Sequence, residues 1–110
     1  MKTYMSILYF NTGIHERINV GLIMFNEEHC IVEIKQSKMD FVKIFKPEAF
    51  ELFKHAINSF KEYYSKEMPT LAQIRRYSIY NNGVFKLESP SFINIEFIGE
   101  NFNKLFDKHI

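Results

Sequence analysis

The first third of the chain alternates short apolar runs with polar turns, at lengths that are typical of β-strands. Residues 2–10 mix β-branched and aromatic side chains, and a polar turn that contains Gly13 follows them. In residues 18–25 both odd and even positions are largely apolar, which predicts a strand covered on both faces. Residues 30–36 begin with alternating apolar and polar side chains. Three strands joined by short links predict an antiparallel meander.

The pattern changes to a helical period at Ser37. Ser37 and Asp40 have the spacing of a capping box, which predicts a short helix over residues 38–45. Pro47 suits the first turn of a second helix, because its missing N–H group has no helical partner there.

A long amphipathic helix is predicted from Pro47 to Tyr64. Phe45 and Phe50 are spaced to pack across its start as a hydrophobic staple. Apolar side chains then recur at steps of three and four residues, which predicts one face turned toward the core. These side chains are Ala49, Phe53, Ala56, Ile57, Phe60 and Tyr64.

A third helix and a fourth strand are predicted next. Thr70 and Gln73 form another capping-box pair in front of a helix over residues 71–77. The two asparagines and the glycine at 81–83 indicate a tight turn, and the strand is expected at 84–87.

The last segment, residues 100–110, is predicted to be a helix docked on the body, after an irregular stretch at 88–92. We expect an α+β fold in which an antiparallel sheet of about four strands is covered on at least one face by helices, with residues 1–110 forming a single domain. The stripe of the last helix consists of Phe102, Leu105, Phe106 and Ile110.

Composition narrows the class of protein. The chain has 110 residues, 46% of them hydrophobic, and twelve of them Phe. These side chains can bury a core large enough to be stable without a disulfide bond. The single cysteine, Cys30, cannot form an internal disulfide and suits the cytoplasm. No run approaches the roughly 20 apolar residues that span a bilayer, so we expect no membrane association. A net charge of +1, with both signs interspersed, argues against affinity dominated by phosphate contacts.

Three segments in order resemble one known family. Residues 16–25 carry a glutamate, an Asn-Val-Gly triplet and an aliphatic run that ends in an aromatic residue; residues 75–92 and 102–110 add an Arg-aromatic stretch and a closing helix with a Leu-Phe pair. Over nearly its whole length the chain resembles the bacterial family catalogued as domain of unknown function 3037. The residues of the first segment are Glu16, Asn19, Val20, Gly21 and Phe25.

That family has no established chemistry, so the resemblance implies no reaction and no cofactor. Genes of the family sometimes adjoin genes for HipA-like kinases. The resemblance therefore implies a regulatory or partner role in a bacterial or phage system, by association only.

Asn19 and Gly21 interrupt the apolar run of the second strand. We interpret both structurally: the amide is expected to bond to the backbone of the preceding turn, and the glycine to let a ring such as Tyr4 or Tyr77 approach closely. The alternative is a candidate polar site in which Glu16 and Asn19 point toward a guanidinium and bind a partner or ligand.

Two adjacent arginines on the third predicted helix supply that guanidinium. Arg75 and Arg76 diverge by about 100° on a helix, so they cannot both face one ligand. We assign Arg76 to the polar site with Glu16 and Asn19, where it either forms a structural salt bridge or binds a phosphate.

Exposed tyrosines offer a contact surface, because the side chain supplies area together with a hydrogen-bonding group. The alternative is that they form the half-buried rim of the core. The leading function is a non-catalytic protein-interaction or regulatory module whose partner is a protein such as a HipA-like kinase. The alternative function is a nucleic-acid or nucleotide-phosphate binding domain that uses Arg75 and Arg76. The candidate surface consists of Tyr63, Tyr64, Tyr77, Tyr80 and Arg75.

No pattern in the chain predicts catalysis, although a small hydrolase or nuclease centred on Glu16 stays open as a third hypothesis. The four histidines lie in separate predicted elements, so no metal site is expected. Cys30 is expected at the start of a strand, without an obvious base placed to activate it, and is interpreted as a buried, inert thiol. We therefore predict no catalytic residue, no metal and no cofactor.

Overall fold

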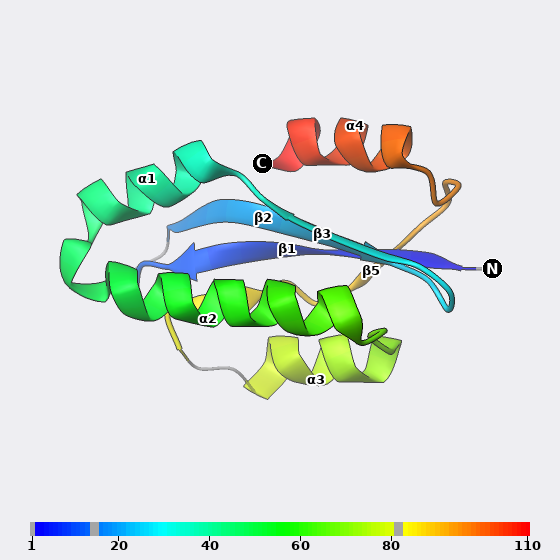
Figure 1. Cartoon of the computed structure of the whole chain (residues 1–110), viewed down its shortest axis with the longest axis horizontal. Coiled ribbons are helices and arrows are strands. Elements are labelled where there is room, and N and C mark those ends of the chain that lie inside the picture. The colour runs from blue at the N-terminus through cyan, green and yellow to red at the C-terminus, as the bar shows by residue number, and fades with distance from the viewer. Residues whose placement is uncertain (1, 14–15, 81–82) are drawn as a thin grey trace.

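One antiparallel sheet forms the middle layer of the molecule, and helices lie on both of its faces (Figure 1). The computed structural model describes residues 2–13, 16–80 and 83–110, without the side chain of Tyr80. The predicted α+β class is confirmed. The strands are β1 (Thr3–Asn11), β2 (Arg17–Phe25), β3 (Cys30–Ile34), β4 (Phe85–Leu87) and β5 (Ser91–Ile93), and the helices are α1 (Gln36–Phe45), α2 (Pro47–Lys66), α3 (Leu71–Tyr80) and α4 (Gly99–His109).

The first three strands form the predicted antiparallel meander, and the sheet order is β3-β2-β1-β4, with β5 also paired to β1. β4 pairs with the second half of β1 and β5 with the first half, so the two short strands make one interrupted edge. At the interruption the backbone N–H of Glu88 donates to the carbonyl of Ile7 at 2.9 Å. The expectation that residues 88–92 are all irregular is wrong, since β5 begins at Ser91.

A β-bulge lies in the middle of the β1–β2 ladder. Leu8 pairs with Gly21 and Tyr9 pairs with Asn19, so Val20 is one extra residue in β2. Because of this extra residue, the side chains of Val20 and Ile23 belong to one core cluster while Leu22 belongs to the other.

Gly21 has no room for a side chain. A Cβ atom built there would lie 2.6 Å from the backbone oxygen of Glu33 in β3 and 3.2 Å from Cδ1 of Leu8. The predicted approach of Tyr4 or Tyr77 is therefore wrong, because the close neighbour is the backbone of the next strand.

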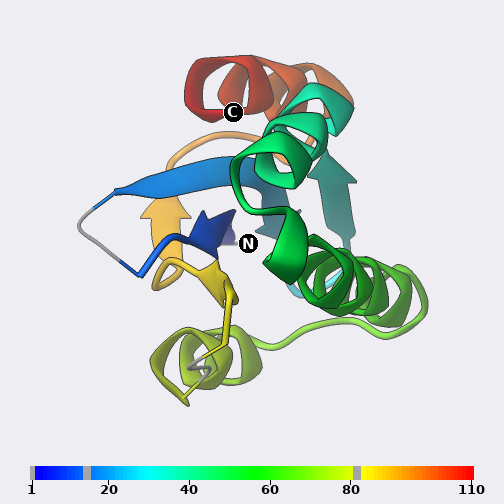
Figure 2. The same cartoon turned by 90° about the vertical axis from the view of Figure 1, so that its left-hand side faces the viewer.

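The larger core lies between the sheet and helices α1, α2 and α3 (Figure 2). The stripe predicted for the long helix is confirmed, with Phe53 and Ile57 fully buried. Phe60 makes edge-to-face contacts with Tyr64, Tyr77 and Phe85 at ring distances of 4.9, 5.4 and 5.5 Å, so α3 and β4 are joined to α2 by aromatic packing.

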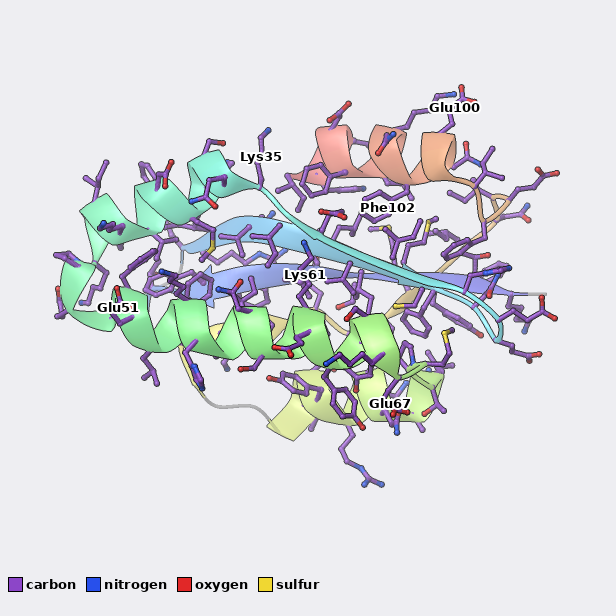
Figure 3. The ribbon with its side chains drawn as sticks, in the orientation of Figure 1. Lys35, Glu51, Lys61, Glu67, Glu100 and Phe102 are labelled. Carbon is purple, nitrogen blue, oxygen red and sulfur yellow. The ribbon has the colours of Figure 1, made fainter. Side chains whose placement is uncertain are left out.

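The opposite face of the sheet is covered by α4. Phe102 points from α4 toward the sheet (Figure 3) and is 3% exposed. Leu22 and Met24 of β2 are buried against it, with Ile110 at the end of the helix. The predicted docking of the last helix is confirmed, and β2 is covered on both faces as expected.

For three helices the sequence offers a start signal, a capping box or a proline, and two of these signals agree with the structure. Pro47 is the first residue of α2, as predicted. In front of α3 the N–H of Gln73 donates to Oγ1 of Thr70, and the N–H of Thr70 donates to Oε1 of Gln73, so that capping box is confirmed. α1 begins at Gln36, so Ser37 lies inside the helix and does not cap it.

Within the described residues, no helix has both the length and the apolarity needed to cross a bilayer.

Candidate functional site

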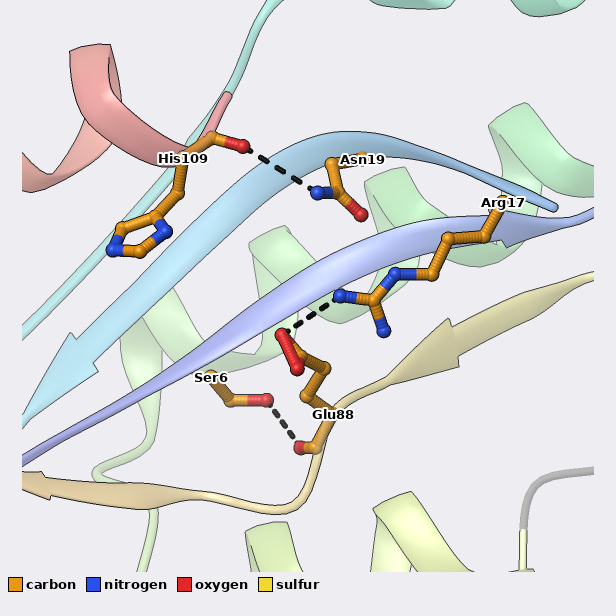
Figure 4. A network of polar contacts seen from close by, with 5 residues as sticks. All are labelled: Ser6, Arg17, Asn19, Glu88 and His109. Carbon is orange, nitrogen blue, oxygen red and sulfur yellow. Dashed lines mark hydrogen bonds and ion pairs between the residues drawn. The ribbon is translucent and has the colours of Figure 1, made fainter.

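A small polar network lies on the sheet beside the bulge (Figure 4). Nη2 of Arg17 is 2.9 Å from Oε1 of Glu88, and the guanidinium carbon lies 4.5 Å from the ring centroid of Tyr9. The hydroxyl of Ser6 donates to the carbonyl of Glu88 at 2.6 Å. More than a third of each charged side chain stays exposed, so the ion pair is worth about 1 kcal/mol or less. The ion pair connects β2 with Glu88, which lies between β4 and β5.

Asn19 connects the second strand with the last helix. Its Nδ2 donates to the carbonyl of His109 at 3.4 Å (Figure 4). The acceptor belongs to α4, and not to the preceding turn as predicted. Oδ1 of Asn19 is buried and, among the described residues, is the one side-chain polar atom sealed from solvent without a partner.

The three residues of the predicted polar site do not come together. Glu16 is exposed beside the start of β2, where its carbonyl accepts a hydrogen bond from the hydroxyl of Thr12. Asn19 faces α4, whereas Arg76 lies exposed on α3, and these two helices lie on opposite sides of the sheet (Figure 1). The guanidinium of the network in Figure 4 is that of Arg17, which pairs with Glu88 and was not part of the predicted site.

The predicted tyrosine surface is brought together in part. Tyr63, Tyr64 and Tyr77 line a groove of about 460 Å³ between α2 and α3, together with His55 and Phe60. Tyr63 is exposed, whereas Tyr64 and Tyr77 are half-buried. The side chain of Tyr80 and the turn at residues 81–82 lie outside the described residues.

Burial changes the acidity of groups next to this groove. Burial raises the pKa of Tyr64, and Tyr63, Tyr77 and Cys30 raise it further. Burial also raises the pKa of Tyr77. The thiol of Cys30 has its pKa raised by burial to about 12, so the reactive thiolate form is suppressed at neutral pH.

The outer face of α1 carries a surface that sequence interpretation missed. Phe41, Ile44 and Phe45 are 53%, 80% and 47% exposed, and the two rings stack with centroids 6.3 Å apart. We call these three residues the α1 ridge. Met39 and Val42 on the other side of the same helix are buried, so α1 is apolar on two faces. Phe45, which is predicted to pack with Phe50 as a staple, also stacks on Phe41.

Within the described part of the chain, no group of three His, Cys, Asp or Glu side chains is placed to hold a metal ion; His15 lies outside it. No family model, no curated protein and no solved structure matches the chain. The resemblance to domain of unknown function 3037 therefore stays a prediction.

Proposed function

We propose that this chain is a non-catalytic protein-interaction module with a regulatory role in a bacterial or phage system. The partner class that the family resemblance implies is a HipA-like kinase. The module would act by covering part of its partner.

The observation that carries the proposal is the α1 ridge. A surface helix normally presents a polar face to water, and apolar side chains at steps of three and four on that face are typical of a helix that docks on a partner. Ile44 is the most exposed large apolar side chain in the described structure. Exposed aromatic and aliphatic anchors of this kind supply most of the binding free energy at interfaces.

The charged side chains around the α1 ridge indicate which partner surface would complement it. Lys35, Lys38 and Lys43 lie on or next to α1, and none of them forms an ion pair within the described residues. Asp40 is the one acidic residue on α1, where it accepts a hydrogen bond from Gln36. The partner surface is therefore expected to be an apolar groove with an acidic rim.

The test is binding to a purified HipA-like kinase, measured by calorimetry for the wild type, Ile44→Lys and Ile79→Lys. Ile79 is a matched control, because it is 61% exposed on α3 and lies away from the ridge. A lysine at the centre of the ridge should weaken binding by about tenfold or more, which corresponds to roughly 1.4 kcal/mol. The control should bind like the wild type.

Equal affinities for wild type and Ile44→Lys would refute the ridge as the contact. Absence of binding by the wild type would refute the kinase as partner class. Circular dichroism of each variant checks that only folded proteins are compared.

A second candidate, nucleic-acid or nucleotide-phosphate binding, is supported by Arg75 and Arg76. Both are exposed, and neither forms an ion pair within the described residues. Binding through phosphates weakens steeply with salt. An affinity for single-stranded DNA that collapses between 50 and 200 mM salt and is lost in Arg76→Gln would favour this function over the first.

A further inference from the structure

A groove of about 640 Å³ lies where the start of β1, the end of β2 and the connection between α2 and α3 meet. Tyr4, Phe25, Met68 and Leu71 give it a mostly apolar lining. Its volume falls in the range of about 300–1,000 Å³ that is usual for small-molecule sites. It is separate from both the α1 ridge and the tyrosine groove.

Asn26 is a buried polar residue in the wall of this groove, and it is only 8% exposed. Its Oδ1 accepts hydrogen bonds from the backbone N–H groups of Glu28 at 2.8 Å and His29 at 2.7 Å. Two donors on that atom fix it as the oxygen, so the orientation of the amide is determined.

The amide nitrogen of Asn26, Nδ2, makes no hydrogen bond to the described part of the protein, yet it is not one of the side-chain atoms sealed from solvent. Because Nδ2 reaches solvent, water can satisfy it in the free protein, and an acceptor on a ligand could take the place of that water. Asn26 thus places an amide with a free donor in the wall of the groove, and the same residue also borders a second hollow beside Thr3 and His29.

The start of α3 adds a second source of positive potential. Thr70 and Leu71 line the groove, and the capping box occupies the N–H of Gln73 but not those of Leu71 and Ala72. Unpaired N–H groups and the helix dipole favour an anion at this end. Lys2 lines the same groove, and Glu27 is the acidic side chain that opposes an anion there.

We propose that this groove binds a small organic anion with a flat apolar body. The apolar body lies against Tyr4, Phe25 and Leu71. The anionic group, a carboxylate or a sulfonate, accepts from Nδ2 of Asn26 and lies close to Lys2 and the start of α3. This site does not depend on the proposed interaction with a protein.

The probe is 8-anilinonaphthalene-1-sulfonate, whose fluorescence rises in an apolar site, titrated against the full chain. Asn26→Asp keeps the oxygen that accepts from the two backbone N–H groups but replaces the donor by a negative oxygen. We expect saturable one-to-one binding to the wild type and an affinity lower by about tenfold or more in Asn26→Asp. Asn58→Asp makes the same charge change on the exposed side of α2 and should bind like the wild type.

Two exposed groove residues make the test independent of how well Asn26→Asp folds. Lys2→Gln should weaken binding of the sulfonate, and Glu27→Gln should tighten it, because the two charges act on the anion with opposite signs. The proposal is overturned if the wild type shows no saturable binding, if Asn26→Asp and Asn58→Asp bind equally, or if the Lys2 and Glu27 variants have the same affinity.

Discussion

At the scale of single residues, Gly21 and Asn19 explain the interruption of an otherwise apolar strand. Gly21 lies at the bulge, where the carbonyl of Glu33 occupies the space of a side chain. Asn19 lies one residue before the bulge and bonds to the end of α4. Both residues serve the joining of backbone segments.

Gly21→Ala should lower the free energy of unfolding by about 1–3 kcal/mol, because a Cβ atom 2.6 Å from a backbone oxygen forces β2 and β3 apart. Urea denaturation measures the change. Gly99→Ala is the control: nothing lies within 4 Å of a Cβ atom there, and the same method should show no loss of stability. Equal stability of the two variants would mean that β3 is not this close to Gly21.

The sequence predicted that these two residues are structural but not which neighbours they meet. An amide and a glycine in an apolar strand indicate a local irregularity. Glu33 belongs to the next strand of the predicted meander, whereas His109 lies 90 residues further along the chain than Asn19, and no local pattern encodes that second contact. Arg76 was assigned to the polar site for the same reason, since periodicity does not say on which face of a sheet a helix packs.

At the scale of elements, predictions succeeded where one apolar face decides the structure. α2 and α4 bury the stripes that their periodicity indicated. α1 was placed less well, because Ser37 and Asp40 have capping-box spacing although both lie inside the helix. The exposed apolar face of α1 was missed because Phe45 was predicted to pack on Phe50 instead. β5 was missed because Ser89 and Pro90 in front of it indicate a break.

α4 should supply most of the packing that buries its face of the sheet. Phe102→Ala removes a ring that is 3% exposed and should destabilise the fold by about 3–5 kcal/mol. Asn103→Ala, an exposed position in the same helix, should stay within about 0.5 kcal/mol of the wild type. Thermal and urea unfolding give both values. A small effect of Phe102→Ala would show that α4 is docked only loosely.

At the scale of the whole molecule, helices cover both faces of the sheet, and the outside of α1 carries three neighbouring large apolar side chains that stay exposed, including Ile44, which is 80% exposed. An apolar ridge on the side of a helix that faces away from the core adds nothing to folding. Its exposure is instead consistent with a surface kept for association, while the lysines beside it set the charge of the expected partner. The sequence led to an interaction module through a family resemblance and placed its contact at the tyrosines, whereas the proposed contact on α1 rests on the exposure of Phe41, Ile44 and Phe45.

Backbone hydrogen exchange, with and without a bound protein partner, tests that claim most directly. Amides that are protected on binding should fall in α1 and its flanks, around residues 36–46, and the protection should be lost with Ile44→Lys. Protection confined to α3 and α4, with α1 exchanging as in the free chain, would contradict the assignment of the α1 ridge as the contact surface.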